Sequence, residues 1–201
     1  MDLTVLDSPG RAVRRQRKRE RLQEAALRLF AERGYHETAI DDIVAAARTS
    51  KSAFYEFFAS KEDCLRELLT VEGGALMQAV ITAAAGAGDH RQRMRLGIRA
   101  FVLTCAEQRS LARLLLVESV GVSPTIEDVR QRLHGRFGAM VEAEVARAAA
   151  KDPHYAGVSP VVFGRALVGA VHHATGQSLV QQDREWDPEA LAEDLCRIFA
   201  P

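Results

Sequence analysis

Three short runs in the first third of the chain repeat apolar side chains every three or four residues. This is the spacing of one face of an α-helix, and each such face has to pack against a neighbour. The runs therefore predict three helices that share a small core. Their apolar positions are Leu22, Ala25, Ala26, Leu29 and Phe30; Ile40, Ile43, Val44 and Ala47; and Phe54, Phe57 and Phe58.

Residues typical of helix ends separate these runs. Gly34 follows the first run, as expected of a C-terminal cap. Thr38 is the expected N-cap of the second helix, with Asp41 completing a capping-box-like start. Ser50 is the expected N-cap of the third helix, and Ser60 that of a fourth. The second and third helices thus form a helix-turn-helix, with the phenylalanines inside and the outer side left for a DNA groove.

Helical spacing continues to the end of the chain, and no strand-like alternation competes with it. One connecting helix covers residues 65–81, with a bend expected at Gly73–Gly74, and further helices cover residues 94–105, 111–115 and 126–145. Residues 160–180 are apolar around most of the helix, so that helix must be covered on two sides. A last helix begins at Asp187–Pro188. The expected fold is all-α, with about nine helices.

Charge is unevenly distributed, although 27 basic residues balance 27 acidic ones overall. Between residues 11 and 61 there are twelve basic and seven acidic side chains, an excess that suits a polyanionic partner. The N-terminal basic run suits phosphate neutralisation or an arm in a minor groove. A solvated, disordered tail is the alternative. The residues expected to contact DNA from this arm are Arg14, Arg15, Arg17 and Lys18.

From residue 17 to about residue 69 the chain resembles the N-terminal domain of the tetracycline-repressor (TetR) family of bacterial regulators. The resemblance rests on many positions in order and spacing: Phe30-Ala31-Glu32-Arg33-Gly34-Tyr35, Thr38, Ser50-Lys51, Phe54-Tyr55, Phe58 and Ser60-Lys61-Glu62. It implies three parts: a basic and flexible arm over residues 1–16, a DNA-binding domain over 17–63, and a helical effector-binding and dimerisation domain over 64–201.

Residue roles follow from the same resemblance. Lys51, Ser52 and Ala53 are expected to face base edges, where a lysine can donate to guanine and small side chains allow close approach. Contacts to phosphate, which fix register, are expected from Thr38, Arg48, Ser50, Tyr55 and Lys61. Arg48 stands where the family usually has glycine. If it adopts a left-handed conformation, the side chain costs about 1 kcal/mol, which a phosphate contact could offset.

The resemblance also implies a ligand cavity and a dimer. The residues expected to line the cavity are Phe101, Cys105, Phe137, Met140, His172 and Trp186, although residues of these types more often form plain core. The last two helices are expected to pair with those of a second copy through Ala166, Ala170, Ala174, Leu191, Leu195 and Ile198. The alternative is a monomer that buries both faces itself. A pseudo-palindromic operator needs the dimer.

Other classes of function find little support. The sequence has no nucleophile elbow, phosphate-binding glycine loop or paired-cysteine zinc spacing, so neither catalysis, a cofactor nor a metal site is expected. No apolar stretch is expected to span a membrane, and a cytoplasmic, nucleoid-associated protein is expected. The favoured function is a homodimeric DNA-binding regulator, by family default a repressor released by a small molecule. The alternatives are a helical adaptor that has lost DNA binding and a small-molecule-modifying enzyme.

Overall fold

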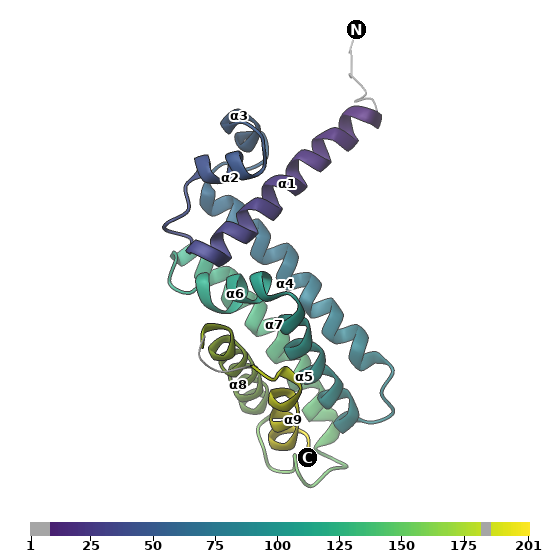
Figure 1. The fold of residues 1–201 in the computed structure, drawn as a ribbon. Coiled ribbons are helices and arrows are strands. Elements are labelled where there is room, and N and C mark those ends of the chain that lie inside the picture. The colour runs from purple at the N-terminus through teal and green to yellow at the C-terminus, as the bar shows by residue number, and fades with distance from the viewer. Residues whose placement is uncertain (1–8, 182–185) are drawn as a thin grey trace.

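A computed structural model describes residues 9–181 and 186–201, and all regular structure in these ranges is helical (Figure 1). This confirms the all-α prediction. The elements are α1 (Pro9–Arg33), α2 (Ile40–Ala46), α3 (Lys51–Tyr55), α4 (Lys61–Ala85), α5 (His90–Glu107), α6 (Arg109–Arg113), a π-helical turn η1 (Leu114–Glu118), α7 (Pro124–Ala148), α8 (Pro160–Val180) and α9 (Pro188–Phe199).

Helices α1, α2 and α3 gather with the start of α4 at one end of an elongated molecule, and α5 to α9 form the other end (Figure 1). The first group encloses a core in which Phe30, Phe54 and Phe58 are almost completely buried. Removing such aromatic side chains from water is the main force that holds short helices together. The Arg19–Glu67 ion pair, with 2.5 Å between nitrogen and oxygen, further joins α1 to α4.

Half of the predicted N-terminal arm is helical. Residues 1–8 lie outside the described residues, and residues 9–16, expected to be flexible, form the first turns of α1. Pro9 suits the first turn of a helix because its missing N–H would be unpaired there. The arginine, alanine and glutamine residues that follow are good helix formers, which explains why the helix extends so far toward the N-terminus.

Thr38 was predicted to be the N-cap of α2, but Ala39 occupies that position. The Thr38 side chain is fully buried, and its hydroxyl donates to the carbonyl of Gly34 at 2.8 Å, which fixes the chain after α1. The cap of α2 is provided by Asp42, whose carboxylate accepts from the Ala39 N–H at 2.8 Å. The caps predicted for α3 and α4 are confirmed, because the Ser50 and Ser60 hydroxyls accept from the N–H groups three residues on.

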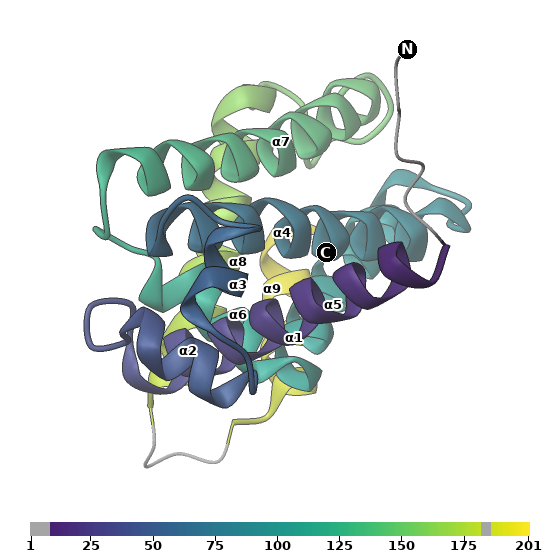
Figure 2. The same cartoon turned by 90° about the horizontal axis from the view of Figure 1, so that it is seen from above.

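Helix α4 is uninterrupted at Gly73–Gly74, where a bend was expected. Gly73 instead allows α7 to approach closely, since a Cβ there would lie 2.7 Å from a methyl group of Leu133. By length and composition alone α4 could cross a membrane, contrary to the sequence expectation. In the fold it packs against α5 and α7 as a central helix of the bundle (Figure 2).

The remaining helices pack around α5 and α7. Helix α8 lies against α7 at a glycine contact, where a Cβ on Gly164 would meet the Gly138 carbonyl oxygen at 2.7 Å. Helix α9 lies along α5, joined to it by an ion pair between Arg95 and Glu193 at 2.9 Å. Helix α6 connects the two ends of the molecule, because Arg113 Nε donates to the Ala31 carbonyl of α1 at 3.1 Å.

Candidate functional site

The outer side of α3 carries polar side chains, and its inner side faces the buried rings of Phe54 and Phe58. Lys51, Ser52 and Tyr55 are exposed, while Phe54 directs its ring into the core. Tyr55 is 54% exposed, so this ring is available for the predicted phosphate contact and does not take part in core packing. The Ser50 hydroxyl accepts from the Ala53 N–H at 3.2 Å and lies 2.9 Å from the Ser52 hydroxyl. The first turn of α3 is therefore a rigid, outward-facing polar surface.

Ala53 does not belong to that surface, although a base contact was predicted for it. Only 4% of Ala53 is exposed. Ala53 and its neighbour Phe54 are the buried residues of α3, so Ala53 lies on the inner side of this helix. Of the three residues predicted to contact bases, Lys51 and Ser52 are therefore the exposed ones.

Lys51 is already engaged by a carboxylate of the neighbouring helix. Its Nζ lies 2.8 Å from an Asp41 oxygen, and this hydrogen bond, more than the Coulomb attraction, raises the pKa of Lys51. Both side chains are more than half exposed, so the pair contributes little to stability. Asp41 therefore holds the ammonium group in place over α3 and can be displaced by a competing acceptor.

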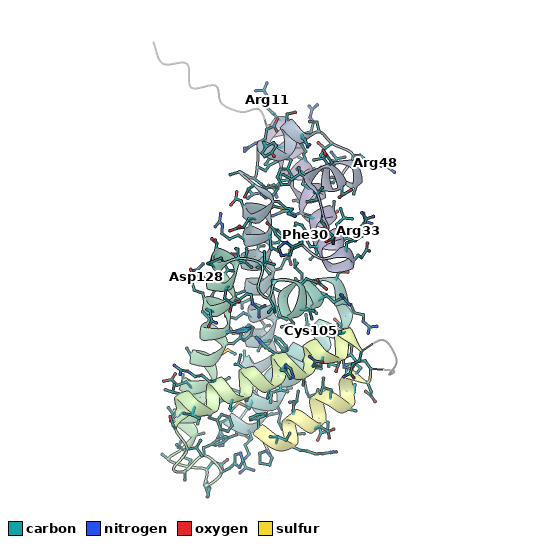
Figure 3. The ribbon with its side chains drawn as sticks, turned by 90° about the vertical axis from the view of Figure 1, so that its left-hand side faces the viewer. Arg11, Phe30, Arg33, Arg48, Cys105 and Asp128 are labelled. Atoms are coloured by element: carbon teal, nitrogen blue, oxygen red, sulfur yellow. The ribbon has the colours of Figure 1, made fainter. Side chains whose placement is uncertain are left out.

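The turn between α2 and α3 has the conformation expected of a glycine, but Arg48 occupies it. Arg48 has φ of 51° and is the only non-glycine residue with positive φ among those described. The Arg48 N–H donates to Ala45 O and the Thr49 N–H to Val44 O, at 3.1 and 2.9 Å. These two bonds form a Schellman motif, in which the position of Arg48 is usually glycine. The Arg48 guanidinium group points outward from the end of the molecule that α1, α2 and α3 form (Figure 3).

Two of the predicted phosphate contacts have structural roles instead. Thr38 is fully buried, so it presents no surface to a backbone phosphate. Lys61 Nζ donates to the carbonyls of Tyr35 and Thr38 at 2.7 and 2.8 Å, and burial lowers its pKa. The ammonium group is hydrogen-bonded to two carbonyls of the loop after α1. A sequence comparison with a DNA-binding family cannot reveal these bonds.

The basic residues of α1 are mostly exposed. Arg14, Arg15 and Arg17 are open to solvent, and the Arg15 guanidinium lies 5.2 Å from the Phe57 ring centroid. Lys18 is half-buried, with Nζ 3.6 Å from Glu56. These residues lie on an ordered helix, so they present positive charge from a fixed position beside α3 instead of a flexible arm.

A cavity of about 280 Å³ lies between α4, α5, α7 and α8. Its outer end contains the exposed Ile81 and Ala85 and two arginines, Arg93 and Arg147, which both pair with Glu144. Its walls are aliphatic, and its inner end is closed by three rings. These rings are Phe101, Phe137 and His172, with the histidine stacked on Phe101 at 4.7 Å between centroids. The cavity is thus apolar inside and cationic at its mouth.

Comparison with known proteins gives a family match for the end of the molecule that contains α1, α2 and α3. Residues 22–68, which run from α1 to the start of α4, match the family model described as "Bacterial regulatory proteins, tetR family". This part of the chain therefore resembles the N-terminal domain of TetR-family regulators.

Relatives of this chain include the "HTH-type transcriptional activator FasR" of Mycolicibacterium smegmatis, which is 34% identical over 92 residues. That match covers 46% of this chain and 42% of the relative, so the chain spans less than half of the relative's length. Two solved structures share the fold at lower identity. FadR from Bacillus subtilis in complex with stearoyl-CoA has a TM-score of 0.80 at 16% identity, covering 90% of this chain and 97% of FadR. AibR in complex with isovaleryl coenzyme A and operator DNA has a TM-score of 0.76 at 19% identity, covering 92% and 98%.

Four of the six residues predicted to line a cavity do line this one, namely Phe101, Phe137, Met140 and His172. Cys105 and Trp186 do not. Cys105 is packed in the core, where burial raises the pKa of its thiol to about 12 and keeps it protonated. Trp186 lies under Arg109, whose guanidinium is 5.4 Å from the ring centroid. Both were chosen by residue type, and their positions in the helices direct them elsewhere.

Sequence reasoning missed the polar residues of the cavity. Arg93, Glu144 and Arg147 were not singled out. Neither was His134, which does not line the cavity but whose ring lies 4.5 Å from that of His172. His134 and Phe137 lie three residues apart on the same side of α7, a spacing that could have drawn attention to it. The described residues contain no cluster of three or more metal-ligating side chains.

Helices α8 and α9 lie side by side at the surface and leave apolar side chains uncovered (Figure 3). Val162 on α8 and Ile198 on α9 are each 63% exposed. Of the predicted dimer residues, Ala166 is also exposed, while Ala170, Ala174 and Leu191 are half-buried. Leu195 is buried within the chain, because its side of α9 packs against α5. It therefore cannot contribute surface to a partner.

Proposed function

We propose that the chain is a transcriptional regulator that binds a pseudo-palindromic DNA operator as a homodimer and is released from it by a small molecule. The observation that carries this proposal is the outer side of α3. Lys51, Ser52 and Tyr55 project outward from a helix whose first turn is capped and whose inner side is fixed by Phe54. Such a helix can enter a major groove and keep its orientation there.

The charges around α3 support the same partner. Lys51 can exchange Asp41 for a guanine acceptor, which gives base discrimination. Arg48, Tyr55 and the arginines of α1 surround it with groups that suit phosphate oxygens. We assign base contact to Lys51 and Ser52 and phosphate contact to Arg48, Ser50, Tyr55, Arg14, Arg15, Arg17 and Lys18. A cytoplasmic location on the nucleoid follows from this role.

A homodimer would cover the exposed face of α8 and α9. Val162, Ala166 and Ile198 leave apolar surface that the chain itself does not bury. Pairing of α8 and α9 with the same helices of a second copy removes that surface from water and makes a self-complementary interface. The two α3 helices then lie at the same side of the dimer, as two half-sites require.

The cavity provides the place for an effector. Its aliphatic walls and cationic mouth suit an amphipathic anion, the class to which the coenzyme A thioesters bound by FadR and AibR belong. Helix α6 and η1 border α8 and also contact α1. A ligand that prefers one arrangement of these helices can change the spacing of the two α3 helices by its difference in affinity between arrangements.

The test uses fluorescence anisotropy with the duplex that precedes the gene for this protein. We expect binding that survives excess competitor DNA and weakens steeply with salt. Lys51→Ala should relax preference at one operator position, at a cost of about 1–3 kcal/mol, while Tyr55→Phe should weaken all duplexes alike. Lys151→Ala, at an exposed site remote from α3, serves as the control. Turnover of a small molecule without DNA retention would favour an enzyme, and neither activity would favour an adaptor.

A further inference from the structure

A second, smaller cavity lies behind the three rings that close the inner end of the first. Its volume is about 20 Å³. Phe101, Phe137 and His172 line both cavities, so these rings form the wall between them. Along α4 the first cavity borders residues 80–85 and the second borders residues 69–76. The second cavity, which we call the inner cavity, therefore continues the first toward the start of α4.

The wall between the two cavities is a closed triangle of rings. Phe101 stacks on His172 with 4.7 Å between centroids, and Phe137 meets Phe101 at right angles with 5.8 Å between centroids. Phe137 and His172 complete the triangle at 5.6 Å. Only 4% of Phe101 and 6% of Phe137 is exposed. Rings packed this closely leave no passage for an alkyl chain unless one of them moves.

The inner cavity suits apolar atoms. Two polar side chains border it, Arg130 and His134. Arg130 is already engaged, since its Nη1 donates to the Leu115 carbonyl at 2.8 Å and to the Ser119 hydroxyl at 2.9 Å. Burial lowers the pKa of His134, which favours its uncharged form. A hydrocarbon tail is therefore a better occupant than a second charged group. The apolar residues that border this cavity are Leu69, Gly73, Leu76, Leu115, Leu116 and Leu133.

The position of the rings sets how far a tail can extend from the mouth of the first cavity. From Arg93 at the mouth to Phe101, α5 advances by eight residues, or about 12 Å at the usual rise. An extended alkyl chain covers that distance with about ten bonds, at roughly 1.2 Å each. From Phe137 to Leu133, α7 continues for four residues, or about 6 Å, which takes about five bonds more. A tail of about ten carbons therefore ends at the rings.

We propose that Phe101 and Phe137 determine specificity for the length of the effector, by closing off the inner cavity as a hydrocarbon subsite. This inference rests on the proposed function, because it assumes that the first cavity receives the effector. The limit is steric. Each methylene that the first cavity can hold is removed from water and favours binding, whereas the next one meets a ring that close packing holds in place. Removing one ring joins the two cavities and admits a longer tail.

Two series of probes measure the limit by isothermal titration calorimetry of the full-length protein. One series is the unbranched carboxylates from hexanoate to hexadecanoate, and the other is their coenzyme A thioesters. In at least one series we expect the wild-type affinity to rise about fourfold with each methylene up to about decanoate, because burial of each methylene favours binding. From there to hexadecanoate the affinity should fall about tenfold or more, because the longer tails meet the rings.

Substitutions of Phe101 test the wall itself. Phe101→Ala should move the tightest-binding probe from decanoate to about tetradecanoate, the length that reaches Leu133. Phe101→Leu, whose side chain is intermediate in size, should produce a smaller shift in the same direction. Phe163→Ala is the matched control, because that ring packs against Tyr155 and Phe199 and borders neither cavity. It should keep the wild-type preference.

The length limit of the wild type is measured whether or not Phe101→Ala folds. Affinity that keeps rising through hexadecanoate would overturn the inference and still leave the first cavity as the effector site. An unchanged preference in the folded Phe101 variants, or the same shift in Phe163→Ala, would overturn it as well, and so would no binding of any probe. Sequence-specific retention of duplex DNA is independent of all these results, so failure of the proposed function is recognised separately by loss of that retention.

Discussion

The Lys61 ammonium group lies 4.1 Å from the centroid of the Tyr35 ring and donates to the Tyr35 carbonyl at 2.7 Å. It thereby joins the start of α4 to the loop that follows α1. A second hydrogen bond, to the Thr38 carbonyl, fixes the chain immediately before α2. Lys61 therefore organises the loop that positions the DNA-binding helices.

Lys61→Met is expected to destabilise the fold more than it weakens the DNA contact. Loss of the charged hydrogen bonds and of the cation–π contact should lower the free energy of unfolding by about 1.5–3 kcal/mol. Urea denaturation measures this, with Lys151→Met as the control. If the variant is as stable as the wild type but binds every duplex more weakly, Lys61 is a phosphate ligand after all.

Arg48→Gly is expected to separate stability from DNA binding. Glycine adopts the left-handed conformation of this turn without strain, so the free energy of unfolding should rise by roughly 0.5–1 kcal/mol. Loss of the guanidinium should weaken DNA binding and reduce the slope of log affinity against log salt by about one. Thermal denaturation and anisotropy measure the two effects. Unchanged DNA affinity and salt slope would mean that Arg48 does not contact phosphate.

Charged substitutions on α8 and α9 are expected to dissociate the dimer. Val162→Glu and Ile198→Glu each place a carboxylate in the proposed apolar interface, where burying an unpaired charge is costly. Sedimentation velocity at micromolar concentration should change from a dimer to a monomer. Val120→Glu, at a valine that is 57% exposed after η1, should leave the dimer intact. A wild-type monomer in this experiment would contradict the interface.

The low pKa of His172 predicts acid sensitivity. The unfolded chain takes up a proton near pH 6.5, but the folded protein does so only near its pKa of about 3. The contribution of His172 to the free energy of unfolding is therefore fully present above pH 6.5 and is lost as the pH falls toward 3. Between pH 7 and pH 5 the wild type should lose about 2 kcal/mol that His172→Phe does not lose. Denaturant titrations at the two pH values measure the difference, and equal losses would show that His172 is protonated in the fold.

Local signals in the sequence predicted the helices from α1 to the start of α4 well, because caps and helix faces depend on neighbouring residues. Ser50 and Ser60 cap their helices, and Phe54 and Phe58 are buried, as their spacing indicates. Ala53 was misassigned because its role was transferred from the family position, whereas the fold buries it with Phe54 on the inner side of α3.

Contacts between distant segments could not be read from the sequence. The pairing of His134 with His172 depends on how α7 crosses α8, which the close contact at Gly164 determines. Likewise, the hydrogen bonds of the Lys61 ammonium group depend on carbonyls in a loop more than twenty residues earlier. Residue type alone suggested Trp186 for the cavity, yet the course of the chain before α9 places it under Arg109.

The most direct test of a dimer that presents two α3 helices to one duplex is selection of binding sites from a random duplex library, followed by sedimentation of the complex. We predict an enriched inverted repeat whose half-sites are about one helical turn apart, occupied by an even number of protein copies. Enrichment of no sequence over competitor DNA at moderate salt, or one protein copy on a single half-site, would contradict the account.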